Sequence, residues 1–168
     1  NLSLQVSVAE DLPDKVFGDG RRLNQILFNL VGNAIKFVRE GSVDLEVSCA
    51  GEADSDPQYV LFSVSDTGPG IPDEQYELIF EPFEQLTKGY TRSHQGAGLG
   101  LPIVRRLVQL MGGSISLDSN PSGGASFYVC LPFSRAAEDA PVENTTQEPM
   151  FEKKNGMRVL VVEDDAIS

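Results

Sequence analysis

Residues 19–37 read DGRRLNQILFNLVGNAIKF, and this stretch predicts a long amphipathic helix. Its apolar residues recur every three or four positions and continue just past it, as Leu23, Ile26, Leu27, Leu30, Val31, Ala34, Ile35 and Val38. That spacing is typical of a helix that packs one face on a core. Asp19 is the expected N-cap, because its carboxylate can accept a hydrogen bond from a free amide of the first turn. Gly41 is expected to end the helix.

Strands and further helices alternate with this helix. Alternating or continuous apolar runs predict strands at 2–8, 43–49, 59–65, 114–118 and 125–131. Helical patterns are expected at about 73–80 and 99–111, the second closed by a glycine pair. Residues 84–98 are polar and aperiodic, so they predict a long loop of the kind that often carries function. The interleaved order predicts a layered α/β domain that ends near Phe133.

The residues after the predicted α/β domain differ from it in polarity and periodicity. The segment 135–156 is polar and aperiodic and is expected to be a linker. The segment 157–168 opens with the apolar run MRVLVV, followed by Glu163, Asp164 and Asp165. This pattern favours a buried parallel strand with acidic groups at its carboxyl end. Because the chain starts at Asn1, we expect it to be a piece of a longer protein, with a domain at 1–134, a linker and the start of another domain.

The composition of the chain argues against several classes of function. The 168 residues carry a net charge of −12, which argues against binding nucleic acid or anionic lipid through a broad basic surface. Any anionic ligand must therefore be held by local, preorganised groups. Two cysteines and one histidine argue against a disulfide framework or a zinc site. No stretch approaches the roughly 18 apolar residues of a membrane span, and no signal peptide is seen, so a cytoplasmic location is expected.

The long helix also carries an unusual polar stripe. At about 100° per residue, Asn29, Asn33 and Lys36 lie within about 60° of one another, with Gln25 and Arg22 on the same side. Asparagine is a poor helix former, but its carbonyl oxygen is a good ligand for Mg²⁺, and lysine is a point-charge partner for phosphate. The alternative is a polar helix face with incidental asparagines.

Two glycine-rich segments could approach a ligand closely. Residues 66–71, DTGPGI, follow a predicted strand, and the Asp66 carboxylate can accept a hydrogen bond from an exocyclic amine such as that of adenine. An ordinary turn explains this segment equally well. Residues 96–101, GAGLGL, open a helix and expose amides that could bind an anion, although their spacing differs from a phosphate loop. Residues 80–83, FEPF, either anchor the long loop or pack in the core, and His94 is expected to be exposed.

The order of these motifs is more specific than any one of them. DGRRLNQILFNLVGNAIKF, DTGPGI, FEPF and GAGLGL resemble the N, G1, F and G2 boxes of bacterial sensor histidine kinases, and GGASFYVCLP resembles their final hairpin. This resemblance covers residues 1–134. MRVLVVEDD is similar to the first strand of a response-regulator receiver domain, so the whole resembles part of a hybrid kinase. The resemblance to histidine kinases implies a Bergerat-type α/β sandwich, in which a mixed sheet has helices on one face. It also implies that ATP is held between the helices and a lid at 84–97.

The resemblance also implies residue roles. Asn33 would coordinate Mg²⁺ with support from Asn29, Lys36 would contact phosphate, and these three form the expected catalytic set. Asp66 would bind the adenine amine. The expected nucleotide contacts are Asn29, Asn33, Lys36, Asp66, Gly68, Gly70, Ile71, Phe83, Arg92, Gly96, Ala97, Gly98, Leu99, Gly100 and Leu101. Glu163 and Asp164 match the metal-binding acidic pair of an incomplete receiver.

The activity implied is transfer of the γ-phosphoryl group of Mg-ATP to a histidine on a separate dimerisation domain, in two-component signalling. Gyrase-like and Hsp90-like ATPases have a glutamate base four residues before the metal-binding Asn, where this chain has Asn29, which favours transfer over hydrolysis. Without the helical hairpin that carries the phosphoacceptor histidine, this chain is not expected to phosphorylate itself. An ATP hydrolase and a nucleotide-sensing module remain alternatives.

The expected partners are the histidine-bearing dimerisation domain of a homodimeric parent kinase and a receiver domain. The parent is compatible with anchoring in the inner membrane, but this segment is expected to contact neither membrane nor nucleic acid.

Overall fold

The computed structural model describes residues 2–13, 15–51, 55–84, 98–119 and 123–135, all of which belong to one compact unit, Asn1–Ala137. Residues 136–168, with nearly all of the expected linker and the receiver-like strand, lie outside the described residues, as does most of the long loop. Those expectations therefore remain predictions. None of the described helices is long and apolar enough to cross a membrane.

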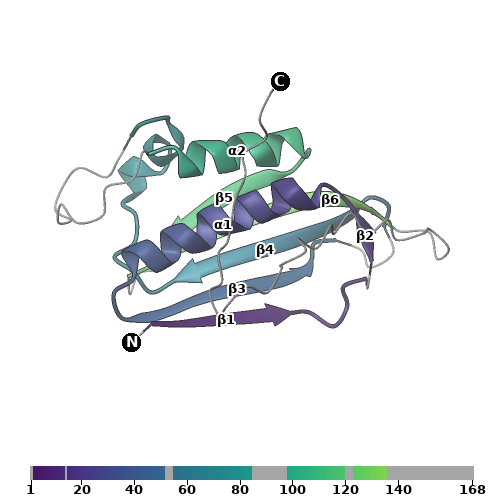
Figure 1. Cartoon of the computed structure of the whole chain (residues 1–168), viewed down its shortest axis with the longest axis horizontal. Coiled ribbons are helices and arrows are strands. Elements are labelled where there is room, and N and C mark those ends of the chain that lie inside the picture. Colours follow the sequence, from purple (N-terminus) through teal and green to yellow (C-terminus); the bar gives the residue numbers. More distant parts are fainter. Residues whose placement is uncertain (1, 14, 52–54, 85–97, 120–122, 136–168) are drawn as a thin grey trace, which may run out of the picture. The chain divides into compact units, whose positions relative to one another are not determined.

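The described residues are built on a six-stranded mixed sheet (Figure 1). Its order is β1-β3-β4-β6-β2, and β5 also pairs with β6. β1 and β3 are parallel, and every other pairing is antiparallel. The strands are β1 (Leu2–Val8), β2 (Val16–Phe17), β3 (Gly41–Cys49), β4 (Gln58–Asp66), β5 (Ser114–Ser119) and β6 (Ala125–Arg135).

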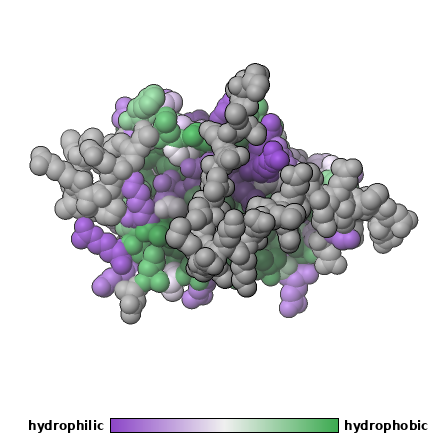
Figure 2. Space-filling view, in the orientation of Figure 1, coloured by the Kyte–Doolittle hydropathy of each residue, from purple (hydrophilic) through white to green (hydrophobic). Residues whose placement is uncertain are grey.

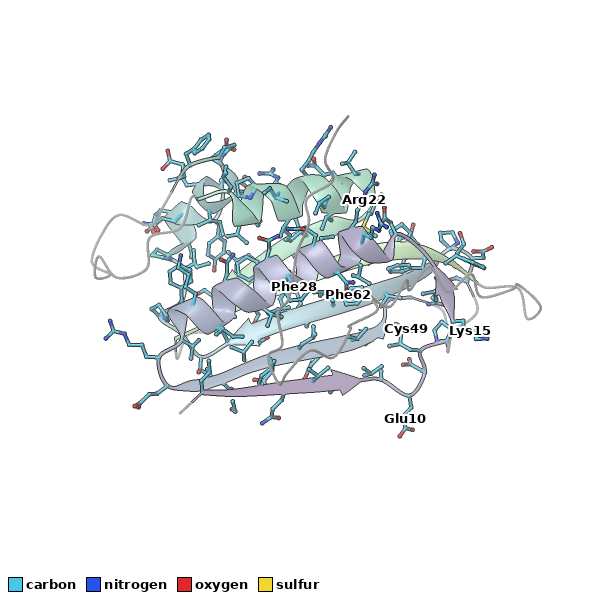
Figure 3. The ribbon with its side chains drawn as sticks, in the orientation of Figure 1. Glu10, Lys15, Arg22, Phe28, Cys49 and Phe62 are labelled. Carbon is cyan, nitrogen blue, oxygen red and sulfur yellow. The ribbon has the colours of Figure 1, made fainter. Side chains whose placement is uncertain are left out.

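The helices lie on one face of this sheet (Figure 1), as predicted. They are α1 (Gly20–Phe37) and α2 (Gly100–Leu110). Alternate residues of the strands point toward the helices, so that Val43, Val64 and Val129 are buried, and α1 contributes Ile26 and Leu30 to the same core. Figure 3 labels Phe62 of β4, another member of this core, in the sheet beneath α1. The apolar stripe that predicted the helix is thus the stripe that packs on the sheet.

The start of α1 confirms the predicted cap, and its end corrects a prediction. The Asp19 carboxylate accepts a hydrogen bond from the Arg22 N–H at 3.0 Å. The helix ends at Phe37 instead of continuing to Gly41, because Val38 is already extended and buried in the core. Gly41 opens β3 with φ of 131°, where any side chain would collide with Thr67.

Two other elements differ from the predictions. The expected helix at 73–80 is a pair of 3₁₀ turns, η1 (Asp73–Gln75) and η2 (Leu78–Phe80). Its large apolar residues are consecutive, so they cannot share one helix face, and only Ile79 of η2 is buried. The two-residue strand β2 was not predicted, because so short a strand has no detectable alternation. β6 also runs beyond the expected Leu131.

Candidate nucleotide-binding site

The two asparagines of the polar stripe lie against the first turn of α2. A methyl group at Gly100 would be 3.1 Å from Asn29 Oδ1 and 3.6 Å from Asn33 Nδ2. Glycine leaves this space free, so the start of α2 and its backbone can lie close to both amides. The predicted N-box stripe and the glycine-rich helix start are therefore brought together by the fold.

The amide of Asn29 has a fixed orientation. Its Nδ2 donates a hydrogen bond to the Gln25 carbonyl one turn earlier, at 2.8 Å. Bonding back to the preceding turn holds the side chain along the helix, with Oδ1 directed toward Gly100. An amide oxygen held in this way is a suitable ligand for a hard cation such as Mg²⁺.

The cations of the stripe have different surroundings. Lys36 is partly buried in the last turn of α1, and its Nζ lies 5.3 Å from the centre of the Phe37 ring. Arg22 lies at the opposite end of the helix (Figure 3), where its Nε is 3.2 Å from the Asp19 carboxylate. Arg22 therefore belongs to the helix cap, whereas Lys36 lies near the asparagines on the same helix.

Asp66 ends β4 and accepts hydrogen bonds from the backbone of the residues around it. The Gly68 N–H donates to its Oδ1 at 2.7 Å, and the Ala125 backbone also bonds its carboxylate. Burial raises the pKa of Asp66, and these two hydrogen bonds offset part of the increase. The result is a partly buried carboxylate that retains acceptor capacity, as adenine recognition requires.

The glycines after Asp66 are required by close contacts. A methyl group at Gly68 would lie 2.7 Å from Asp66 Oδ1 and 3.3 Å from the side chain of Val38 at the end of α1. Gly70 has φ of 76°, and a methyl group there would lie 3.0 Å from both the Gly124 carbonyl and Ser119 Oγ. The loop therefore packs closely on α1 and on the β5–β6 hairpin.

Several residues that anchor this loop were not predicted. The Thr67 hydroxyl accepts from the Ser42 N–H at 2.9 Å, and the Thr67 N–H donates to the Ser42 carbonyl at 3.1 Å. On the other side, the Tyr76 phenol bonds Ser119 and Asp73, and burial is the main cause that raises its pKa. The contacts of Thr67 with Ser42 and of Tyr76 with Ser119 join positions far apart in sequence and follow no periodicity, so no sequence signal could have found them.

Phe83 and Gly98, which flank the predicted lid, are hydrogen-bonded to each other. The Phe83 N–H donates to the Gly98 carbonyl at 3.2 Å. Phe83 has φ of 67°, which is uncommon outside glycine, and its ring is 74% exposed. Gly98 also has φ of 67°, and a methyl group there would be 2.9 Å from the Glu84 carbonyl. Arg92, Gly96 and Ala97 lie outside the described residues.

The remaining predicted nucleotide contacts among the described residues are Ile71, Leu99 and Leu101. Ile71 and Leu101 pack against the core, and the Leu99 carbonyl accepts from the Ile103 N–H at 3.1 Å in the first turn of α2. Arg105 of α2, which was not predicted, lies with its guanidinium 5.5 Å from the Phe80 ring centre and 3.8 Å from the Glu77 carboxylate. This residue joins α2 to the FEPF segment before the lid.

Helix α1 connects the two parts of the candidate site. Asn29 and Asn33 lie at Gly100, and Val38 lies at Gly68. At about 1.5 Å of rise per residue, Val38 lies roughly 8 Å from Asn33 and roughly 14 Å from Asn29 along the helix axis. In the described part of the chain, no group of three or more histidines, cysteines or acids could hold a metal ion. Glu163 and Asp164 lie outside that part.

Comparison with known proteins agrees with this arrangement. Residues 18–135 match the family described as histidine kinase-, DNA gyrase B- and HSP90-like ATPases. The sensory/regulatory protein RpfC of Xanthomonas campestris pv. campestris is 41% identical over 145 residues, covering 86% of this chain and 20% of RpfC. The autoinducer 2 sensor kinase/phosphatase LuxQ of Vibrio vulnificus is 39% identical over 164 residues, covering 98% of this chain and 19% of LuxQ. The chain thus spans about a fifth of the length of these curated relatives.

Solved structures of histidine kinases also match the fold of this chain. Full-length ShkA in complex with AMPPNP matches with a TM-score of 0.68 and 40% identity, covering 81% of this chain and 26% of ShkA. The mycobacterial sensor histidine kinase MprB matches with a TM-score of 0.63 and 30% identity, covering 80% of this chain and 84% of MprB. The predicted fold class is confirmed, and the chain belongs to the family of histidine kinase-, DNA gyrase B- and HSP90-like ATPases.

Proposed function

We propose that this chain binds Mg-ATP between α1, the 66–71 loop and the first turn of α2, and that it supplies the γ-phosphoryl group to a histidine on a separate dimerisation domain. The observation that carries the proposal is the position of Gly100 against Asn29 and Asn33. It brings the side-chain amides of Asn29 and Asn33 to the amino end of a helix, where backbone N–H groups favour phosphate. The ShkA structure with AMPPNP supports an adenine nucleotide as the ligand.

Each candidate residue has a role in this proposal. Asp66 accepts the adenine amine, and Gly68 and Gly70 admit the base beside the loop. Asn33 holds Mg²⁺ through its amide oxygen with support from Asn29, and the ion neutralises phosphate charge when bound. Lys36 contacts a phosphate oxygen once its ammonium turns from the Phe37 ring. The predicted lid contacts, including Phe83 and Arg92, close over the nucleotide.

The amide at position 29 favours transfer over hydrolysis. A general base must take a proton from the attacking water, and a carboxamide does not do this near neutral pH. The side chain of Asn29 is also held in place by its bond to the Gln25 carbonyl. Without a base here, the chain contributes positioning and charge stabilisation, which is sufficient for phosphoryl transfer to a good nucleophile.

Calorimetric titration with ATP, with and without Mg²⁺, tests the site. Mg²⁺ should strengthen binding to the unaltered chain, and Asn33→Ala should lose that gain. Asn24→Ala is the matched control, because Asn24 is an exposed asparagine on the same helix, on the side away from the stripe. Equal Mg²⁺ dependence in both variants and the unaltered chain would place the metal elsewhere.

A second experiment tests the reaction. With labelled ATP, the chain joined to the histidine-bearing helices of its parent should yield phosphohistidine. Phosphate release at a steady rate without a histidine substrate would favour a hydrolase. Nucleotide binding with neither product would favour a sensing module. We propose the same dimerisation domain and a receiver domain as partners, within a homodimeric parent that works in the cytoplasm.

A further inference from the structure

Strand β1 leaves one edge of the sheet open. It pairs with β3 from Leu2 opposite Gly41 to Val8 opposite Val47, and no strand of the described residues pairs with its other edge. Leu4, Val6 and Val8 are 52%, 61% and 62% exposed. Figure 2 shows hydrophobic surface between hydrophilic residues in the lower part of the view, where Figure 1 places β1 and β3.

This edge lacks the features that usually prevent strand pairing. Charged side chains, prolines and bulges protect exposed edges in most sheet proteins. β1 reads LSLQVSV, with no charged residue and no proline, in a chain whose net charge is −12. A neutral and regular edge of seven residues in so acidic a chain favours pairing with another neutral strand.

The free backbone groups of β1 can be assigned. The Ala9 N–H donates to the Val47 carbonyl at 2.9 Å. In a parallel pair, alternate residues direct both backbone groups to the same neighbour, so Ser3, Gln5 and Ser7 also bond toward β3. The N–H and C=O groups of Leu2, Leu4, Val6 and Val8 therefore point to the open edge.

We propose that β1 pairs antiparallel with β1 of a second copy of this chain, about a two-fold axis at Gln5. LSLQVSV has the same order of residue classes in both directions. Pairing about Gln5 places Leu2 opposite Val8, Leu4 opposite Val6, and Ser3 opposite Ser7. The outward-facing residues of one copy then meet those of the other, and each such pair exchanges two hydrogen bonds. A self-complementary surface of this kind is what a two-fold dimer requires.

The dimer should be weak and sensitive to salt. One strand edge buries less area than a standard stable interface, so association is expected only at high protein concentration. Two copies that each carry a charge of −12 repel one another, and salt screens this repulsion. Association should therefore strengthen as salt increases, opposite to the behaviour of an interface held by ion pairs.

Sedimentation analysis of a concentration series up to about 1 mM tests the edge as an interface. The unaltered chain should form dimers, and Leu4→Lys should remain monomeric because it places a charge on the strand. Leu110→Lys is the matched control, since both leucines are 52% exposed and Leu110 ends α2. The control should dimerise like the unaltered chain. Monomers at every concentration, or equal dimerisation of both variants, would overturn the proposal.

A cysteine experiment tests the register. The two Gln5 residues form a pair without mutual hydrogen bonds, with Cα atoms about 4.5 Å apart, within the range of a disulfide. In a background of Cys49→Ser and Cys130→Ser, Gln5→Cys should form a disulfide-linked dimer under mild oxidation. Ser3→Cys should not, because Ser3 faces Ser7 of the second copy. Absence of a link through Gln5, or equal linking at both positions, would contradict this pairing.

Discussion

Asp66 combines a stability cost with a proposed role in recognition. Burial raises its pKa above the usual 3.8, so the folded state holds the proton to a higher pH than the unfolded chain does. The stability from this group is therefore present below its unfolded pKa and declines as pH rises through the window just above 3.8. Above that window, the folded protein bears the cost of burying the ionised form, which the hydrogen bonds from the Gly68 and Ala125 backbone partly offset.

The substitution Asp66→Asn should separate the effect of Asp66 on stability from its effect on ATP affinity. At pH 7 the free energy of unfolding should change little, because removal of the buried charge is offset by the loss of acceptor capacity for the Gly68 and Ala125 backbone, whereas ATP affinity should fall roughly 10- to 100-fold. The amide has a single oxygen, and the Gly68 N–H already bonds the corresponding Asp66 oxygen at 2.7 Å. Denaturant unfolding and calorimetry measure the two quantities. A variant that unfolds more easily and binds ATP normally would contradict the proposed role of Asp66.

Gly100→Ala should weaken Mg-ATP binding without unfolding the protein. Its methyl group would lie 3.1 Å from Asn29 Oδ1, which is close enough to displace that amide. Gly32→Ala is the control, because a methyl group at Gly32 in α1 meets nothing within 4 Å. The control should raise the free energy of unfolding by roughly 0.5–1 kcal/mol and leave ATP affinity unchanged. If titration gave equal affinities for the two variants, contact with Asn29 would have no role in binding.

The sequence predicted which of the two asparagines' neighbours share a helix face better than it predicted the contacts around them. The spacing of Asn29 and Asn33 on one helix face was sufficient to place them together, because a helix has a fixed period. Arg22 shares that face but bonds Asp19 at the cap, which spacing alone does not reveal. The bond between Tyr76 and Ser119 depends on tertiary contact and was not predictable.

At the scale of elements, α1 depends on its cap. Asp19→Ala should lower the free energy of unfolding by about 1 kcal/mol, because the Arg22 N–H loses its acceptor. Glu74→Ala, which removes an exposed carboxylate from η1, should have a much smaller effect. Thermal or denaturant unfolding of both variants measures the difference, and equal values would mean that the cap adds no stability.

Elements with a clear period were predicted within a few residues, and elements without one were not. α2 was expected at 99–111 and spans Gly100–Leu110, because its apolar residues recur at helical spacing. The end of α1 was placed too late, because burial of Val38 overrides the helical pattern. The 73–80 segment became two 3₁₀ turns, since its apolar residues are adjacent in sequence.

At the scale of the molecule, the core between sheet and helices determines stability. Leu131→Ala should cost about 2–5 kcal/mol, because Leu131 is fully buried and its neighbours cannot fill the cavity. Leu110→Ala should cost far less, since Leu110 is 52% exposed. Urea unfolding should show a lower midpoint for the first variant and an unchanged slope. Similar midpoints would indicate that the sheet tolerates a cavity at β6.

The contact between Gly100 and Asn29 also bears on inhibitor design. Resistance to many inhibitors arises by substitution of a residue that the inhibitor touches and its target does not need. Gly100 offers no such route, since every other residue adds a carbon 3.1 Å from the Asn29 oxygen and should impair Mg-ATP binding. Substitution of Gly100 to escape a compound that contacts this pair should therefore also weaken the binding of Mg-ATP.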